Sequence, residues 1–161
     1  MMSGMTIRPA TKADMDAVLP LVAKTCAFHE AANPVKYPFL PEPEKRYRRW
    51  LTERTADPRS VFLVACDGQR VVGFLVAETE PEIPIYRVSE YAFIHDMWVE
   101  EPYRRRGLAR RMLQDAVARF QMIGVGQIRL DVLQENQPAR RLFESCGFAA
   151  SVVEMILPLG R

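Results

Sequence analysis

The residues most suited to chemistry are arginines that crowd the middle of the chain: Arg104, Arg105, Arg106, Arg110 and Arg111. They follow an apolar run and lead into residues 108–120, where apolar side chains recur every three or four positions, as in an amphipathic helix. The first N–H groups of a helix have no internal partner, and the helix dipole adds positive charge there. The turn therefore predicts a site for a phosphate-bearing ligand.

Two other interpretations of this turn remain open: a solvated basic surface, and a patch that contacts nucleic-acid phosphates. Gly107 and Ala109 are small enough for a ligand to approach the backbone closely, which favours a shaped phosphate site. The sequence contains neither a P-loop nor a GxGxxG motif. A net charge of +2 and the lack of interleaved aromatic residues argue against a nucleic-acid partner.

The elements around the turn predict a mixed α/β fold. Strands are expected at residues 6–9, 60–66, 71–78, 91–99, 127–133 and 148–157, and helices at 12–31, 44–54, 108–120 and 136–146. Thr11 and Asp14 form the capping pattern of the first helix, Asp67-Gly68 is a tight-turn pair, and Asn136 caps the last helix. The strand–helix–strand unit from 91 to 133 requires a parallel pairing or a crossover.

The composition is that of an ordinary globular chain, with 161 residues, 48% hydrophobic and 26% charged. These values exclude a collagen, a coiled-coil rod and a disordered tail, and residues 1–161 are expected to form one domain. No apolar run approaches the length of a membrane span, and the first residues do not resemble a secretory signal, so a cytoplasmic protein without a membrane partner is expected. Cys26, Cys66 and Cys146 are too dispersed to predict a disulfide framework or a metal site.

In these features the chain resembles the GNAT N-acetyltransferase superfamily. Its pyrophosphate signature, (Arg/Gln)-x-x-Gly-x-(Gly/Ala), is similar to residues 104–109, Arg-Arg-Arg-Gly-Leu-Ala. Residues 96–103 resemble the strand and turn that carry the pantetheine arm, and residues 136–148 resemble the second family motif. The opening residues 6–14 are also similar to the GNAT entry, so only residues 33–58 lie outside the resemblance.

The resemblance implies a mostly antiparallel sheet flanked by helices, with a splayed central strand pair. It also implies acetyl-CoA as the acyl-donor co-substrate, no metal, and direct attack by a primary amine of a small molecule or peptide in a ternary complex. Homodimers are common among GNAT proteins, so a homodimer is a further expectation. The cofactor-binding residues implied are Met97, Trp98, Val99, Arg104, Arg105, Arg106, Gly107, Leu108, Ala109, Arg110, Asn136 and Phe143.

Direct attack also requires a group that takes the proton from the amine. Asp96 is the first candidate for this general base, and His95 and Glu90 are weaker ones. Strict strand alternation places Asp96 and His95 on opposite faces, although a bulge would change that. Apolar neighbours would raise the pKa of Asp96 and make it a better base near neutral pH.

One residue departs from the family pattern. Phe143 stands where many GNAT members have a tyrosine that protonates the leaving thiolate, and Phe143 has no proton to donate. Tyr86, Tyr91 and Tyr103 are candidate substitutes. Because an ordinary thiolate is a tolerable leaving group, this departure leaves acetyl transfer open. It also supports an alternative function, a non-catalytic acetyl-CoA-binding regulatory module.

Overall fold

The sheet observed in the structure has five strands. The computed structural model describes residues 4–160, and its strand order is the order along the chain, β1-β2-β3-β4-β5. The strands are β1 (Met5–Pro9), β2 (Ser60–Asp67), β3 (Arg70–Pro81), β4 (Glu90–Val99) and β5 (Ile128–Leu130). All neighbours are antiparallel except β4 and β5, which are parallel. The expected mixed, mostly antiparallel α/β fold is confirmed.

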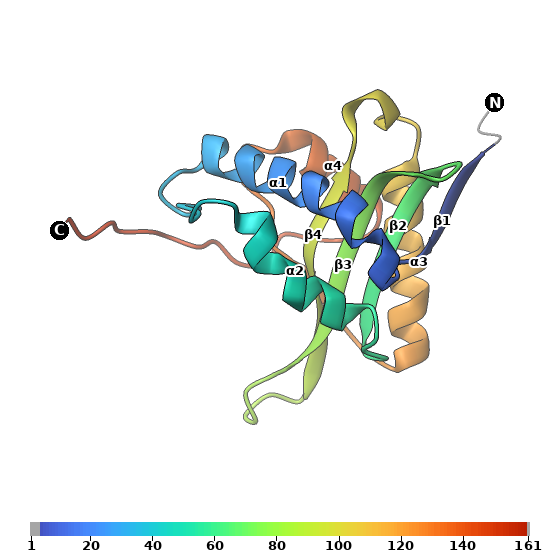
Figure 1. Ribbon diagram of the computed structural model, residues 1–161. Coiled ribbons are helices and arrows are strands. Elements are labelled where there is room, and N and C mark those ends of the chain that lie inside the picture. Colours follow the sequence, from blue (N-terminus) through green and yellow to red (C-terminus); the bar gives the residue numbers. More distant parts are fainter. Residues whose placement is uncertain (1–3, 161) are drawn as a thin grey trace.

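Helices cover both faces of this sheet (Figure 1). One face carries α1 (Met15–Ala32) and α2 (Pro43–Arg54), and the other carries α3 (Leu108–Ile123) and α4 (Gln137–Ser145). Alternating strand residues feed two apolar cores: Leu75 and Ala77 face the α3 side, whereas Phe74 and Val76 face the α1 side. The near-continuous apolar strands β2 and β3 follow from this burial on both faces.

The entry into α1 has the predicted capping pattern. The Thr11 N–H donates to Asp14 Oδ2 at 2.8 Å, and the first turn, Lys12–Asp14, is a 3₁₀ helix. The Arg8 guanidinium donates to both oxygens of the same carboxylate, at 2.7 and 2.8 Å. A bidentate pair of this kind is both strong and geometrically specific. It fastens β1 to the start of α1.

These contacts lower the pKa of Asp14 to about 2, chiefly through the hydrogen bond from Arg8. A depressed carboxyl pKa stabilises the fold above the unfolded-state value near 4, and this contribution is lost as pH falls toward 2. We therefore expect Asp14→Asn to lower the free energy of unfolding by about 2 kcal/mol at pH 7. Urea titrations at pH 7 and pH 2.5 check this, because the difference between variant and parent should shrink at the lower pH. Asp16→Asn, at a carboxylate that is 87% exposed, is the control and should change little.

The parallel pair β4 and β5 is short, and beyond it the two chains diverge. Ala92, Phe93 and Ile94 pair with residues 128–130, and then β4 continues to Val99 while the chain after Leu130 leaves the sheet. The predicted strand 127–133 is thus shortened to three residues. The expected splayed pair is present, and it leaves one edge of β4 without a strand neighbour over residues 95–99 among the described residues.

The predicted final strand at residues 148–157 is wrong. The chain after Gly147 has no helix or strand up to residue 160, and most of it is exposed. Figure 1 shows it leaving the body as an extended tail. A strand needs a neighbour for its backbone N–H and C=O groups, and no sheet edge of the described chain pairs with this segment. Within residues 4–160, no helix is long and apolar enough to cross a membrane.

Candidate active site

The turn between β4 and α3 presents a row of unpaired backbone donors. Arg105 and Gly107 both have left-handed backbones, with φ of 61° and 79°, and Gly107 is the N-cap of α3. In the described part of the chain, the N–H groups from Arg105 to Arg110 have no hydrogen-bond partner, and the first helical bond is made by the Arg111 N–H to the Gly107 carbonyl. Left-handed turns and helix starts both form concave anion sites. This loop can therefore bind phosphate oxygens.

Two of the predicted arginines are already engaged in the protein. Arg104 Nε donates to the Val99 carbonyl oxygen at 2.7 Å, and its guanidinium lies 4.6 Å from the centre of the Trp98 ring. Arg110 Nη2 donates to Ser145 Oγ at 2.7 Å, which ties α3 to α4. These side chains shape the turn, so its anion-binding capacity comes chiefly from the backbone.

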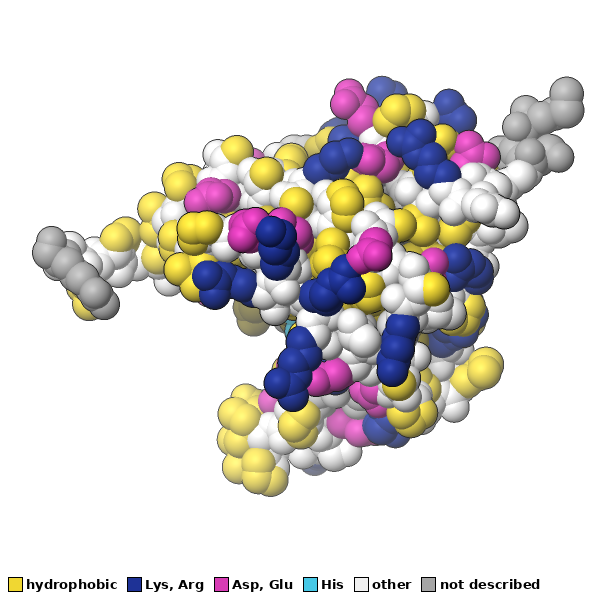
Figure 2. Space-filling view, viewed as in Figure 1, with side chains coloured by type: hydrophobic (Ala, Val, Ile, Leu, Met, Phe, Trp, Pro, Cys, Tyr) yellow, Lys and Arg dark blue, Asp and Glu magenta, His cyan; other side chains and the backbone are white. Residues whose placement is uncertain are grey.

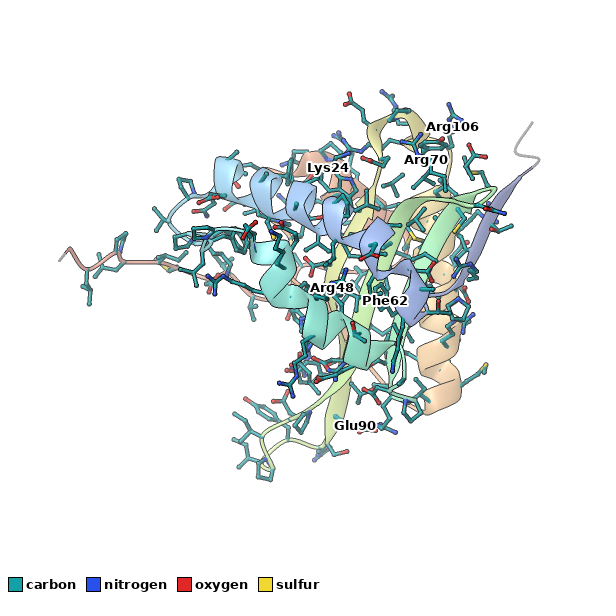
Figure 3. The ribbon with its side chains drawn as sticks, in the orientation of Figure 1. Lys24, Arg48, Phe62, Arg70, Glu90 and Arg106 are labelled. Atoms are coloured by element: carbon teal, nitrogen blue, oxygen red, sulfur yellow. The ribbon has the colours of Figure 1, made fainter. Side chains whose placement is uncertain are left out.

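The other residues of the motif divide between solvent and core. Arg105 and Arg106 are exposed, Ala109 is half-buried, and the Leu108 side chain is fully enclosed in the α3-side core. Figure 3 shows Arg106 and Arg70 at the same end of the sheet. The end of the molecule that carries the free N–H groups therefore also carries these two arginines.

Residues 97–99, which the resemblance assigns to the pantetheine arm, form the end of β4. Met97 and Val99 pack toward the α3-side core, and Trp98 packs toward the α1 side. Trp98 Nε1 donates to Glu100 Oε2 at 3.4 Å, and Glu100 in turn pairs with Lys24 at 2.5 Å. The side chains of residues 97–99 therefore pack within the protein. The backbone N–H and C=O groups on the unpaired edge of β4 are the groups that a ligand could reach.

Gly73 sets the distance between β3 and this part of β4. A Cβ at position 73 would lie 2.8 Å from the Trp98 carbonyl oxygen, closer than real Cβ atoms approach. We expect Gly73→Ala to lower the free energy of unfolding by about 1 to 3 kcal/mol, because β4 must shift to relieve the overlap. Thermal unfolding measures this. Gly126→Ala, where a Cβ has open space, is the control and should unfold near the parent temperature.

A β-bulge in β4 brings the two base candidates together. Val76 pairs with Asp96 and Ala77 pairs with Ile94, so His95 is the extra residue. A bulge breaks strict alternation, and both side chains turn toward α2: His95 lies 5.0 Å from Trp50, ring centre to ring centre, and Asp96 contacts Tyr47. The structure therefore has the bulge that the sequence left open in place of strict alternation, and it puts Asp96 and His95 on the same face.

Asp96 and Tyr47 form the central polar pair of this region. The Tyr47 hydroxyl donates to Asp96 Oδ2 at 3.0 Å. Burial raises the pKa of Asp96, and the hydrogen bond from Tyr47 opposes part of that rise. Burial and the nearby carboxylate both raise the pKa of Tyr47, so the hydroxyl keeps its proton. Tyr47 was not among the residues predicted from the sequence, although its helical spacing from Trp50 could have indicated a shared face.

His95 lies beside two more carboxylates. Its Nε2 is 3.2 Å from Glu78 Oε1 and 3.2 Å from Glu80 Oε1, and burial lowers its pKa. Arg54 also pairs with Glu78. One ring nitrogen of His95 and one carboxylate oxygen each of Glu78 and Glu80 lie within 4.8 Å of one another. These carboxylates would attract a cationic group. Neither Glu78 nor Glu80 was among the general-base candidates predicted from the sequence.

The remaining candidates lie elsewhere or have other partners. Glu90 is six residues before Asp96, about 20 Å along an extended strand, and pairs with Arg59 at 2.5 Å; Figure 3 shows it at the opposite end of the sheet from Arg106. The Tyr91 and Tyr103 hydroxyls donate to carboxylates, those of Glu80 and Asp67 respectively. Tyr86 is exposed on the β3–β4 connection. None of these three hydroxyls lies next to Phe143 in the contacts of the described residues.

The two residues of the second motif have structural partners. Asn136 Oδ1 accepts a hydrogen bond from the Ala139 N–H at 3.3 Å, as a helix N-cap. Phe143 is buried, and its ring packs edge-on against Phe148 at 5.8 Å. Phe143 therefore belongs to the core beside α3, as well as to the region that the resemblance assigns to the cofactor.

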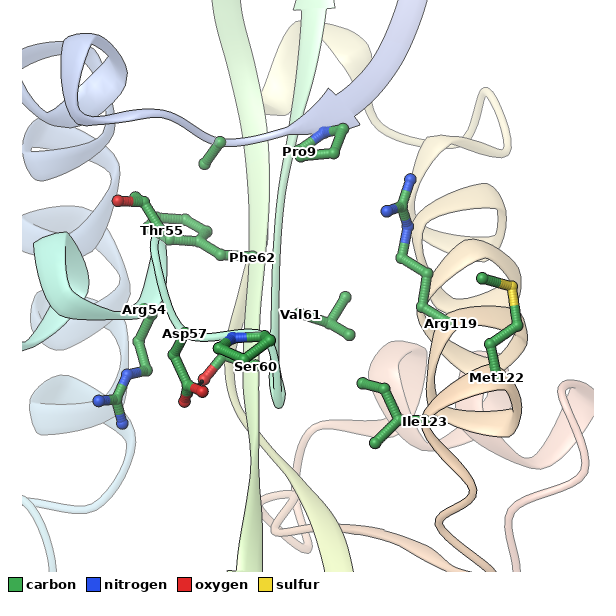
Figure 4. Close-up of a pocket in the computed structure, with 12 residues that line it drawn as sticks. Pro9, Arg54, Thr55, Asp57, Ser60, Val61, Phe62, Arg119, Met122 and Ile123 are labelled. Carbon is green, nitrogen blue, oxygen red and sulfur yellow. Dashed lines mark hydrogen bonds between the residues drawn. The ribbon is translucent and has the colours of Figure 1, made fainter.

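Hollows in the described surface lie in separate places. Figure 2 shows a hollow between the protruding β3–β4 hairpin and the layer of α1 and α2. A different depression, of about 330 Å³, lies between the end of α2, the start of β2 and the end of α3 (Figure 4). Its lining includes Arg119 and Ile123, at the opposite end of α3 from Gly107. This depression therefore does not include the turn at residues 104–110 that presents the free N–H groups.

With this geometry in place, comparison with known proteins decides the family. Residues 25–148 match the acetyltransferase (GNAT) family. The chain belongs to the GNAT family. Acyl transfer is the chemistry of this family.

Individual relatives agree with this assignment. The chain is 36% identical over 85 residues to the uncharacterized N-acetyltransferase YycN of Bacillus subtilis, an alignment that spans 53% of this chain and about half, 52%, of that protein. A mutant of the BH1408 protein of Bacillus halodurans has the same fold, with a TM-score of 0.81, 24% identity and coverage of 96% and 99% of the two chains. So does the aminoglycoside N-acetyltransferase AAC(6')-Iy in complex with CoA, with a TM-score of 0.75, 15% identity and coverage of 96% and 94%.

Proposed function

We propose that this GNAT protein is an acetyl-CoA-dependent N-acetyltransferase that acts on a primary amine of a small molecule or peptide. The observation that carries the proposal is the row of unpaired N–H groups from Arg105 to Arg110, directly beyond the free edge of β4. A ligand that ends in a pyrophosphate and begins in an amide-containing arm suits both features. A fold neighbour that holds CoA supports the same ligand.

The donor would be held mainly by main-chain groups. The edge of β4 at Met97 and Val99 would pair its backbone with the amide arm, and the N–H groups of residues 105–110 would donate to the pyrophosphate oxygens. The exposed Arg105 and Arg106 add positive charge that the backbone alone lacks. Because main-chain N–H groups would bind most of the pyrophosphate, the site does not need the side chains of Arg104 and Arg110, which bind other parts of the protein.

On the acceptor side, Asp96 is the group that would take the proton from the amine. An amine must lose a proton as it attacks a thioester, and a carboxylate of raised pKa is a suitable base near neutral pH. Tyr47 holds this carboxylate in place. Glu78 and Glu80 lie near on the same face and favour an acceptor that arrives as an ammonium ion. Its first proton goes to solvent before the attack, and Asp96 takes the second as the nitrogen bonds to the acetyl carbon. Neutral His95 is the alternative base on the same bulge.

The leaving thiolate receives no proton from Phe143. We expect solvent to protonate it after it leaves, because a thiol pKa near 8.5 makes the thiolate a tolerable leaving group and keeps the free thiol mostly protonated at neutral pH. The reaction then needs no tyrosine acid: the amine nitrogen forms the new bond to the acetyl carbon, the carbon–sulfur bond breaks, and Asp96 holds the proton of the amine.

The test is CoA release from acetyl-CoA by the purified chain, followed with a thiol reagent, across a panel of polyamines, amino acids, aminoglycosides and peptides. Release that depends on an acceptor supports the proposal. Saturable acetyl-CoA binding without release by any amine favours the non-catalytic regulatory module. No acetyl-CoA binding at all overturns the donor assignment itself.

A further inference from the structure

Three side-chain atoms converge on one point beside the β4 bulge. His95 Nε2 lies 3.2 Å from Glu78 Oε1 and 3.2 Å from Glu80 Oε1, and the three atoms lie within 4.8 Å of one another. We call these three residues the bulge cluster. Neither contact has the geometry of a hydrogen bond, so the buried His95 Nε2 has no partner within the described chain. A small group with several N–H donors would supply that partner and also bond both carboxylates.

The charges around this point leave room for one more cation. Glu78 already pairs with Arg54. Burial lowers the pKa of His95, so its ring is neutral and Nε2 can accept a hydrogen bond. The polar partners of Glu80 within residues 4–160 are His95 and the Tyr91 hydroxyl, which donates to Glu80 Oε2 at 2.9 Å. Both partners are neutral, so Glu80 keeps an uncompensated negative charge.

An ammonium group suits this point better than a divalent metal ion. It has three N–H donors, and at a hydrogen-bond length of about 2.8 Å its tetrahedral donors reach acceptors roughly 4.6 Å apart. That spacing is close to the spread of the three acceptor atoms. The Arg54 guanidinium, on the same carboxylate of Glu78, would repel the second charge of a metal ion. The geometry therefore favours a group with a single positive charge.

The bulge cluster lies within reach of a short alkyl chain from Asp96. Val76 pairs with Asp96, and Glu78 and Glu80 follow Val76 at two-residue intervals, on the same face of β3. One interval spans about 6.7 Å, so these two residues lie roughly 7 and 13 Å along the strand from Asp96. The Glu80 carboxylate reaches back to His95, next to Asp96 in the chain, which shortens the longer distance.

Aromatic rings line the way between the two points. Trp50 lies edge-on to His95 with ring centres 5.0 Å apart, and the Phe93 ring is also 5.0 Å from His95. Tyr47, which donates to Asp96, stacks on Trp50 at 4.7 Å. The three rings are half-buried and offer apolar surface that suits methylene groups. The hollow between the β3–β4 hairpin and the layer of α1 and α2 opens on this side of the sheet (Figure 2).

We propose that the acceptor is a linear aliphatic diamine or polyamine, whose second ammonium group binds the bulge cluster while the reacting amine lies at Asp96. This inference rests on the proposed function, because it names the substrate class of the same site. Glu80 is the specificity-determining residue. It binds a charge that the reaction leaves unchanged, so it selects the acceptor without taking part in acetyl transfer. A monoamine of the same length would leave the bulge cluster without a cation.

The test compares acceptors that differ by one ammonium group. CoA release is measured with putrescine and cadaverine, and with butylamine and pentylamine, which have the same alkyl lengths and a single amine. We expect kcat/KM to be about 10- to 100-fold higher for each diamine, as one charge-assisted hydrogen bond provides, chiefly through a lower KM. Equal values, or release with other amines only, overturn the inference and leave the proposed function standing. No release with any amine overturns both.

Three variants show whether the preference belongs to Glu80. Glu80→Gln keeps a hydrogen-bond acceptor and removes the charge, so the preference for diamines should disappear. Glu80→Asp keeps the charge and should retain most of the preference. Glu82→Gln, at a carboxylate that pairs with Arg129 at 2.7 Å, is the matched control and should keep the preference of the parent. A preference that survives Glu80→Gln overturns the assignment.

A titration with zinc chloride distinguishes an ammonium site from a metal site. Calorimetry should give the same result for the parent and Glu80→Gln. Saturable zinc binding that Glu80→Gln abolishes would identify the bulge cluster as a metal site and overturn the inference. Circular dichroism should show the variant folded, because the Glu80 side chain is 31% exposed and Glu78 keeps its ion pair with Arg54.

Discussion

Gly107→Val is expected to weaken acetyl-CoA binding by about 30- to 150-fold. The N-cap of α3 has a left-handed backbone with φ of 79°, which a β-branched residue adopts only at a cost of about 1 to 2 kcal/mol. The loop relaxes, and the N–H groups no longer converge. Losing one or two hydrogen bonds to a charged phosphate amounts to about 2 to 3 kcal/mol. Calorimetric titration with acetyl-CoA measures the change.

The control for this variant lies at the other end of the same helix. Gly124 is also left-handed, with φ of 92°, and a Cβ has open space at either glycine. Gly124→Val therefore introduces similar backbone strain without touching the phosphate loop. It should lose stability and keep its affinity for acetyl-CoA. Equal affinity in both variants would show that the α3 start does not hold the donor.

Asp96→Asn is expected to lower kcat by about 10²- to 10⁴-fold, the usual contribution of a general base. Burial raises the pKa of Asp96, so the ionised form needed for catalysis is lost as pH falls through that raised value. The kcat of the parent should therefore drop on the acid side, and the Asn variant should lose this dependence. Because ionised Asp96 costs folding free energy above its unfolded-state pKa, the Asn variant should fold at least as well. Acetyl-CoA affinity should be unchanged.

Two further variants show whether the effect belongs to this carboxylate. Glu90→Gln removes a carboxylate from the same strand, at an ion pair with Arg59 far from the bulge, and should leave kcat near the parent value. Tyr47→Phe removes the hydrogen bond that lowers the pKa of Asp96. Its acid limb should move to higher pH while the plateau is retained. If the acid side of the kcat–pH profile does not move in Tyr47→Phe, the ionising group is not Asp96, and His95 becomes the base.

Local patterns predicted most of the elements and the turn that presents free N–H groups. Periodicity located the strands and helices, and Thr11 with Asp14 marked the entry into the first helix. The arginine-rich turn before an amphipathic helix indicated an anion site, and the two motifs around it indicated the family. These features are encoded over a few consecutive residues, so they can be recognised without the fold.

Long-range pairing accounts for what those patterns missed. Whether 148–157 forms a strand depends on a neighbouring edge, and the described chain provides none. The exposed arginines looked alike in sequence, yet Arg104 bends back onto Val99 and Arg110 binds Ser145. Which arginine remains free for a ligand therefore depends on tertiary partners, and the partner of Arg110, Ser145 at the end of α4, is far from it in the sequence.

The sequence by itself determined the class of fold, the helix start that can bind phosphate, and the short set of residues from which a base must come. Only the tertiary structure decided which side of the sheet those residues face. The bulge at His95 turns Asp96 toward α2, where Tyr47 donates to it. A one-residue insertion in a strand reverses the direction of every later side chain, and its position depends on how β4 pairs with β3, which no local pattern encodes.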